Sequence, residues 1–156
     1  MDARLASETD FPGFREEARA LLGQQVPPEA VHWQTAQEQG GYRLADPVRP
    51  AGNRPRDARK AASAIVPASF LRLCEFVVLH RHPGRFALLY RLLWRLVHEP
   101  GLRSDPIDPD MLHAHQMAQA VRRDLRRMKA FLRFRSIDDG QGAPLKLAWF
   151  EPAHYI

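Results

Sequence analysis

The sequence predicts an α+β protein that is mostly helical, with about four helices and a C-terminal β-hairpin. Helix start signals precede segments whose apolar residues recur at helical spacing. Near the C-terminus, two short apolar and aromatic segments flank a turn-rich sequence. The 156 residues are 45% hydrophobic and 26% charged, which is typical of a single folded domain spanning residues 1–156.

The first helix is expected to begin after Asp10, because Asp is a common N-cap and Pro12 suits a first helical turn. The apolar pattern behind it ends near Gly23, and a short helical turn is expected at residues 28–33. Residues 34–63 contain several Gly and Pro and only scattered apolar side chains, so they predict a long, mobile loop.

Two further helices are predicted at residues 67–80 and 85–98, separated by Pro83 and Gly84. The first is apolar at nearly every position. In the second, the polar stripe consists of Arg91, Arg95 and His98. Both should therefore form the buried centre of the protein.

The fourth helix has the clearest period. Asp108 and Pro109 form a start signal, and apolar residues follow at alternating spacings of three and four. These residues are Met111, Ala114, Ala118, Val121, Leu125 and Met128. Arginines and a lysine occupy the flank and far side of the same helix, so one face should be core and the other basic.

A hairpin is predicted from a strand at residues 131–135, a turn at 138–142 and a returning strand at 145–150. Phe131 or Phe134 could offer a stacking surface for an unpaired base, but a place in the core is the preferred interpretation. If the first strand alternates with a period of two, at least one of the two rings should face the core.

Charge is unevenly distributed along the chain, which has 23 basic and 18 acidic residues and a net charge of +5. The high overall arginine content is weak evidence for nucleic-acid binding, because a GC-rich genome produces such a content without functional demand. Residues 122–135, however, hold seven basic side chains against one acid, a pattern that suits a phosphate backbone but also a solvated helix face. The predicted nucleic-acid contacts are Arg122, Arg123, Arg126, Arg127, Lys129, Arg133 and Arg135.

A second basic stretch lies within the predicted loop. It is interpreted as a secondary basic arm for a polyanion, or else as a solubilising insertion. Its residues are Arg49, Arg54, Arg56, Arg59 and Lys60.

Candidate catalytic chemistry is confined to Glu151 and His154, a carboxylate and an imidazole that could act as general acid and base. Metal binding is not expected, because His113 and His115 point to opposite sides of their helix, and His80 and His82 straddle a helix end. Cys74 lies in an apolar helix and should be a buried, unreactive thiol. No motif for a cofactor is present, so none is expected.

The longest apolar runs, at residues 76–79 and 86–90, are too short for a membrane span. The first residues lack the apolar core of a secretion signal, and one cysteine cannot form an internal disulfide. A cytoplasmic location is therefore expected, with no membrane partner.

Several motifs occur together in this chain. They are Phe86 to Leu96, Val121 to Asp124, Met128 to Phe131, Arg133 to Arg135, and Ala148 to Pro152 with His154. Together they resemble a bacterial family of DNA-metabolism proteins of otherwise unknown function. Its members stand alone beside a radical-SAM protein, or form the N-terminal part of a fusion to a uracil-DNA glycosylase-like domain of the uracil-binding type. The resemblance covers most of the chain outside residues 34–63.

The chain also departs from that family's pattern. Ser136 stands where an acidic residue is usual, and the long loop is unusual. The family continues beyond the Trp-Phe-Glu-Pro motif at residues 149–152, which leaves open whether this chain is an N-terminal fragment.

Three functions remain open from the sequence. The resemblance implies a DNA-repair accessory domain that binds DNA through the basic helix and strand and works with a glycosylase-like domain or a radical-SAM protein. The alternatives are a protein-interaction domain that docks an acidic partner, and a catalytic domain acting on a nucleotide or base through Glu151 and His154. The sequence leaves open whether the domain is itself an enzyme, and also its oligomeric state.

Overall fold

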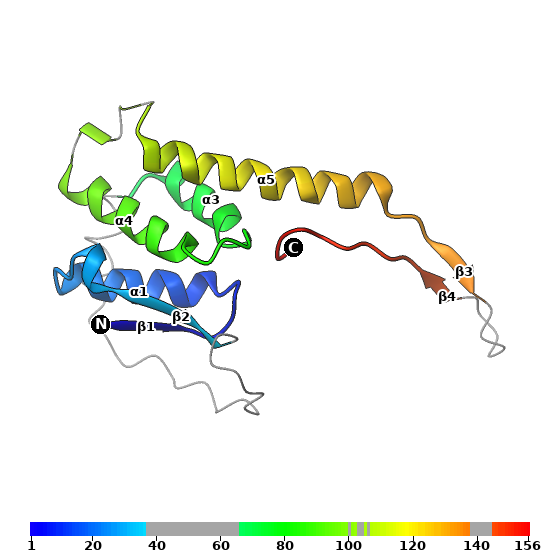
Figure 1. The fold of residues 1–156 in the computed structure, drawn as a ribbon, viewed down its shortest axis with the longest axis horizontal. Coiled ribbons are helices and arrows are strands. Elements are labelled where there is room, and N and C mark those ends of the chain that lie inside the picture. Colours follow the sequence, from blue (N-terminus) through cyan, green and yellow to red (C-terminus); the bar gives the residue numbers. More distant parts are fainter. Residues whose placement is uncertain (37–65, 100, 103–104, 106, 138–144) are drawn as a thin grey trace.

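The computed structural model describes residues 1–36, 66–99, 101–102, 105, 107–137 and 145–156. The described chain is an α+β structure in which helices predominate, as the sequence predicts (Figure 1). The elements in chain order are β1 (Asp2–Leu5), α1 (Phe11–Gly23), the 3-10 helix η1 (Pro28–Ala30), β2 (His32–Thr35), α3 (Ala68–Val77), α4 (Arg85–His98), α5 (Pro109–Phe131), β3 (Arg135–Ile137) and β4 (Leu145–Leu147).

The helices begin where local signals place them. The Asp10 carboxylate accepts the backbone N–H of Gly13 at 2.9 Å, and that of Asp108 accepts the N–H of Met111 at 2.9 Å. Each aspartate thus satisfies an otherwise unpaired donor in the first turn of α1 or α5. The bounds of α4 match the prediction, and α3 is shorter than expected at both ends.

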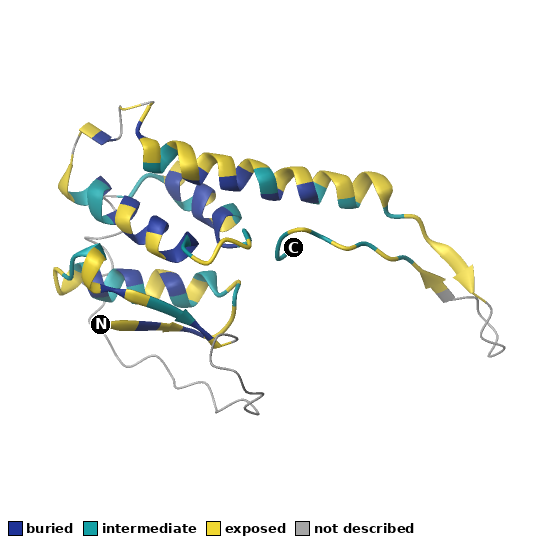
Figure 2. Ribbon diagram, viewed as in Figure 1, coloured by how far each residue is buried: buried dark blue, intermediate teal, exposed yellow. Residues whose placement is uncertain are grey.

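Helix α4 lies at the centre of the core, where it packs against α1, α3, α5 and β2 (Figures 1 and 2). Its residues Phe86, Leu89, Tyr90 and Leu92 are almost completely buried. The Phe86 ring lies 5.6 Å from that of Phe14 on α1, measured between centroids. Helix α3 is likewise buried along one face, so α3 and α4 together form the buried centre that their apolar composition predicts.

The parallel pair of β1 and β2 was not expected from the sequence. Asp2 pairs with His32 and Leu5 with Thr35, on either side of α1 in the chain. The predicted helical turn at residues 28–33 is wrong beyond Ala30, because His32 begins β2. The expected loop at 34–63 likewise begins inside this strand, and its residues from 37 onward lie outside the described structure.

Arg85, at the start of α4, is a buried residue whose guanidinium group is charged. It donates hydrogen bonds to the backbone carbonyls of Val78 at 2.9 Å, His82 at 3.1 Å and Glu8 at 2.6 Å, and pairs with the Glu8 carboxylate. Burial alone would raise the pKa of Glu8, but hydrogen bonds from Thr35 and Arg85 and the charge of Arg85 lower it below its ordinary value. This arginine joins the N-terminal segment to the turn between α3 and α4.

Helix α5 projects beyond the core (Figures 1 and 2). Its buried residues end at Asp124, yet the helix continues to Phe131. The predicted strand at 131–135 is therefore wrong: the N–H of Leu132 still donates to the Met128 carbonyl at 3.0 Å, and β3 starts only at Arg135. Alternating apolar and polar residues favour a strand only where the apolar side chains pack on a core. Residues 131–134 lie beyond the core, because α5 projects past it, and the alternating pattern therefore has no such effect there.

The hairpin of β3 and β4 extends from the end of α5, with Arg135 opposite Leu147. The returning strand ends at Leu147 rather than at residue 150, and the predicted turn at 138–142 lies outside the described residues. The last residues run back to the core, where the N–H of Tyr155 donates to the Leu79 carbonyl at 2.9 Å. Within the described residues, no helix combines the length and apolarity that a membrane span needs.

Candidate nucleic-acid interface

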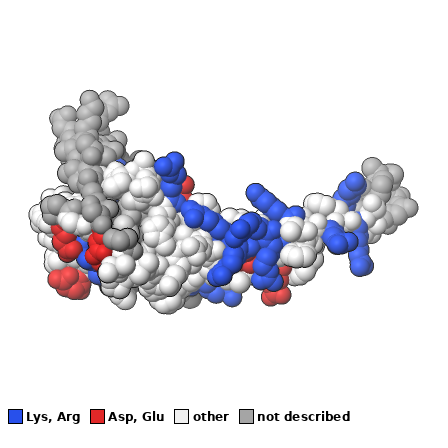
Figure 3. Space-filling model, turned by 90° about the horizontal axis from the view of Figure 1, so that it is seen from above, with Lys and Arg blue, Asp and Glu red and all other residues white. Residues whose placement is uncertain are grey.

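The projecting part of the molecule, residues 122–137 and 145–150, is named the basic arm here. All seven basic residues predicted as nucleic-acid contacts lie on it, and all are exposed. Seen from the α5 side, Lys and Arg side chains gather over the outer half of this helix and again along the hairpin (Figure 3). None of the seven forms an ion pair with another described residue, whereas Arg85, Arg91 and Arg95 on α4 each have carboxylate partners.

Asp124 is the acidic residue within this basic segment, and it binds the C-terminal segment of the chain. Its side chain is buried, with only 4% of the residue exposed. One carboxylate oxygen accepts the backbone N–H groups of Ala153 at 2.7 Å and His154 at 3.0 Å. Asp124 therefore anchors the C-terminal segment, and it forms no ion pair with the arginines of the described arm.

The basic side chains form two rows on α5, because residues four apart lie one above the other on a helix. Arg123 and Arg127 stand in one row that ends at Phe131. Arg122, Arg126 and Lys129 lie along the other flank. The Arg122 guanidinium lies 4.3 Å from the centroid of the Phe76 ring on α3, which holds it at the edge of the core.

Three of the four aromatic residues of the arm are exposed, contrary to expectation, and the fourth, Phe150, is half-buried. Neither Phe131 nor Phe134 faces the core: 67% and 64% of these residues are exposed. Trp149 is 86% exposed, and sequence reasoning did not single it out as a surface residue. A two-stranded hairpin detached from the core has no second layer against which to bury such rings.

The secondary basic arm predicted at Arg49, Arg54, Arg56, Arg59 and Lys60 lies outside the described residues.

Glu151 and His154 line one open cavity of about 790 Å³, together with Arg81, Leu125 and Tyr155. They are brought to the same cavity, but no hydrogen bond joins them in the described part of the chain. The Nδ1 atom of His154 instead accepts the N–H of Arg81 at 3.4 Å. The geometry therefore places a carboxylate and an imidazole beside one solvent-filled space without pairing them.

Four histidines from three segments meet beside this cavity. The ring centroids are 4.4 Å apart for His80 and His154, 6.5 Å for His80 and His82, and 5.9 Å for His82 and His113. Burial, followed by the neighbouring positive charges of His154 and His82, lowers the pKa of His80 to about 4. Sequence reasoning treated these residues as separate pairs, because only the fold brings the segments together.

Two of these histidines use a ring nitrogen in a local hydrogen bond. The Nδ1 atoms of His80 and His82 accept backbone N–H groups of His82 and Gly84, at 3.1 and 3.0 Å. Among the described residues, no group of three or more His, Cys, Asp or Glu side chains is arranged to hold a metal ion.

Cys74 is buried as predicted, with 1% of the residue exposed. Burial raises the pKa of its thiol to about 12, so the thiolate that would act as a nucleophile is scarce at neutral pH.

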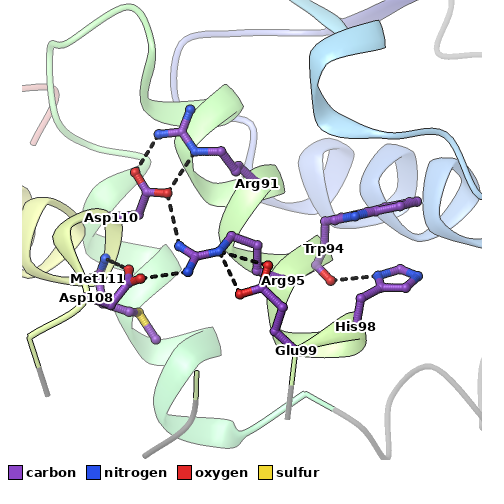
Figure 4. Close-up of polar contacts among 8 residues, drawn as sticks. All are labelled: Arg91, Trp94, Arg95, His98, Glu99, Asp108, Asp110 and Met111. Carbon is purple, nitrogen blue, oxygen red and sulfur yellow. Dashed lines mark hydrogen bonds and ion pairs between the residues drawn. The ribbon is translucent and has the colours of Figure 1, made fainter. Parts of the chain in front are cut away.

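The polar stripe of α4 has a structural role. Arg95 donates to the Asp108 carboxylate at 2.7 Å and to Asp110 at 3.2 Å, while Arg91 pairs with Asp110 (Figure 4). Hydrogen bonding from Arg95 lowers the pKa of Asp108 below its ordinary value. These ion pairs fix the start of α5 against α4 and so set the direction in which the basic arm projects.

Comparison with known proteins matches part of the chain to a protein-family model. Neither the search of curated proteins nor that of solved structures found a match to the chain. A family model described as a domain of unknown function (DUF4130) matches residues 83–156. The matched region runs from the start of α4 through α5 and the hairpin, so the basic arm belongs to a segment similar to a domain of unknown function.

Proposed function

We propose that this protein binds nucleic acid through its basic arm and serves as an accessory domain in DNA metabolism or repair. The observation that carries the proposal is the set of seven exposed basic side chains that lack carboxylate partners among the described residues. A row of such charges on a projecting helix and strand matches the regular negative charge of a phosphate backbone.

The energetics of α5 support this function. Arg122 and Arg126, and likewise Arg123 and Arg127, are like-charge pairs four residues apart on one helix. Each such pair destabilises an exposed helix by about 0.2–0.5 kcal/mol. A polyanion laid along the arm would remove this repulsion and release the counterions of the phosphates.

An accessory role fits the geometry better than catalysis. Glu151 and His154 share an open cavity but are not joined by a hydrogen bond, and Cys74 is buried and unreactive. The partner in this proposal is a glycosylase-like domain or a radical-SAM protein, which the resemblance to a DNA-metabolism family suggests. It would supply the chemistry, while the basic arm supplies affinity for the substrate.

The test is fluorescence anisotropy of labelled DNA titrated with the wild-type protein and with the Arg123→Ala/Arg127→Ala variant. The matched control is Arg4→Ala/Arg15→Ala, which removes the same charge from exposed positions on β1 and α1. The proposal predicts that the arm variant weakens binding at least tenfold, whereas the control changes it by less than about threefold.

Equal effects of the two variants, or no binding by the wild-type protein at low salt, would contradict the proposal. In that case the basic arm would be a surface for an acidic protein partner.

A further inference from the structure

We infer that the ligand of the basic arm is single-stranded nucleic acid, whose unpaired bases stack on Phe131, Phe134 and Trp149. The inference rests on the proposed function and specifies its substrate class. Its basis is the exposure of all three rings within a basic surface.

The three rings lie around one junction, where α5 gives way to the hairpin. Phe131 is the last residue of α5, and Phe134 directly precedes Arg135, the first residue of β3. Arg135 pairs with Leu147, and Trp149 follows two residues later, so Trp149 leaves the hairpin at the end where Phe134 enters it. The register therefore brings Phe134 and Trp149 to the same end of the ladder.

Basic side chains surround this junction. Arg127 stands one helical turn before Phe131, Arg133 precedes Phe134, and Lys146 lies on β4 opposite Ser136. Within the described arm the one carboxylate is that of Asp124, which is buried and bonded to backbone N–H groups. The junction thus combines exposed aromatic faces with positive charge, and the nearest exposed acid that follows it in the chain is Glu151, two residues after Trp149.

Single-stranded nucleic acid has the complementary chemistry. Its phosphates require cations, and its bases present flat apolar faces that a duplex keeps stacked within itself. The outer part of α5, from Arg122 to Phe131, is about 14 Å long at 1.5 Å per residue. That length accommodates more than one phosphate of a strand, so the basic rows would hold phosphates while the bases beyond them reach the rings.

An acidic protein partner explains the charges but does not require exposed rings beside them. A second copy of this chain would cover the apolar side chains but would bring two basic arms together. Charge complementarity therefore favours a polyanion as the ligand. The experiment below also distinguishes it from an acidic protein and from a second copy of this chain.

The experiment compares three ligands of about 15 nucleotides: a thymidine oligonucleotide, an abasic strand of equal length and a duplex. The abasic strand carries the same phosphates without bases. The inference predicts that the wild-type protein binds the thymidine strand at least tenfold more tightly than the abasic strand, and more tightly than the duplex.

The variants Phe131→Leu, Phe134→Leu and Trp149→Leu keep an apolar side chain and remove the ring. All three positions are exposed, so folding should be retained and is checked by the thermal midpoint. Each change should weaken binding of the thymidine strand about tenfold and leave binding of the abasic strand unchanged.

Binding should also quench tryptophan fluorescence in the wild-type protein. Trp149→Leu should abolish most of this quench, since Trp33 and Trp94 are half-buried.

Three results would overturn the inference. The first is equal affinity for the thymidine and abasic strands, and the second is leucine variants that bind as the wild-type protein does. The third is a dimer in sedimentation that the leucine changes dissociate. If DNA binding still depends on Arg123 and Arg127 in those cases, the proposed function stands and only the single-strand inference fails. Absence of all DNA binding would remove both.

Discussion

His80 is the residue whose surroundings give the described structure a pH dependence on the acidic side of neutrality. It faces His154, His82, His113 and Arg85, and its pKa is lowered from an ordinary 6.5 to about 4. Between these values the unfolded chain binds a proton that the folded protein does not, so the free energy of unfolding falls as pH falls through this window.

The expected result is a decline in stability, measured by urea unfolding, between pH 6.5 and 4.5, above the range in which Glu8 and Asp108 titrate. The variant His80→Gln, which cannot be protonated, should show a shallower decline. The same slope in both proteins would show that His80 does not govern this dependence.

Asp124 should hold the C-terminal segment in place. Replacing it with alanine leaves the N–H groups of Ala153 and His154 without their acceptor, at a cost of about 1–3 kcal/mol for each group that remains buried. We expect Asp124→Ala to be trimmed by a carboxypeptidase much faster than the wild-type protein. Asp124→Asn keeps a side-chain oxygen and should lie between the two. Equal digestion rates would contradict the anchoring role.

At the scale of elements, the first half of α5 should contribute most of this helix's share of the free energy of unfolding, and its outer part should contribute little. Asp108 caps the helix and pairs with Arg95, so Asp108→Ala should lower the free energy of unfolding by about 2 kcal/mol. Arg123→Ala, on the outer part of the same helix, should change it by less than about 0.5 kcal/mol. Urea unfolding checks both values, and a similar loss at the two sites would contradict this division.

The hairpin of β3 and β4 should be weakly ordered in the free protein. Two short strands without a covering layer are marginally stable, and Ile137 and Leu147 are exposed. Hydrogen exchange should therefore be fast at the paired amides of residues 135–137 and should slow when a single-stranded oligonucleotide binds. Strong protection in the free protein would indicate that something other than nucleic acid stabilises the hairpin.

At the scale of the whole molecule, the parts with local signals were predictable. The caps at Asp10 and Asp108 and the period of α5 are properties of neighbouring residues, so the helices follow from the sequence. The pairing of β1 with β2 joins segments on either side of α1, and no local pattern encodes it. The four histidines meet for the same non-local reason.

The candidate site was predictable in its charges but not in its rings. Charge is read directly from residue type, and the seven basic residues are exposed as expected for contacts. The exposure of Phe131, Phe134 and Trp149 depends on how far α5 extends past the core. That distance is set by where the apolar face of α5 loses its partners on α3 and α4, which the sequence of α5 alone does not contain.

The central claim is that the basic arm binds nucleic acid by neutralising phosphates, and the salt dependence of single-strand affinity tests it most directly. The seven exposed basic side chains of the arm predict a slope of about −5 in a plot of log affinity against log salt concentration, at about −0.7 per phosphate. Arg123→Ala/Arg127→Ala should reduce the magnitude of that slope by about 1.4, and the control Arg4→Ala/Arg15→Ala should leave it unchanged. A slope near zero, or one that the arm variant does not alter, would contradict the account.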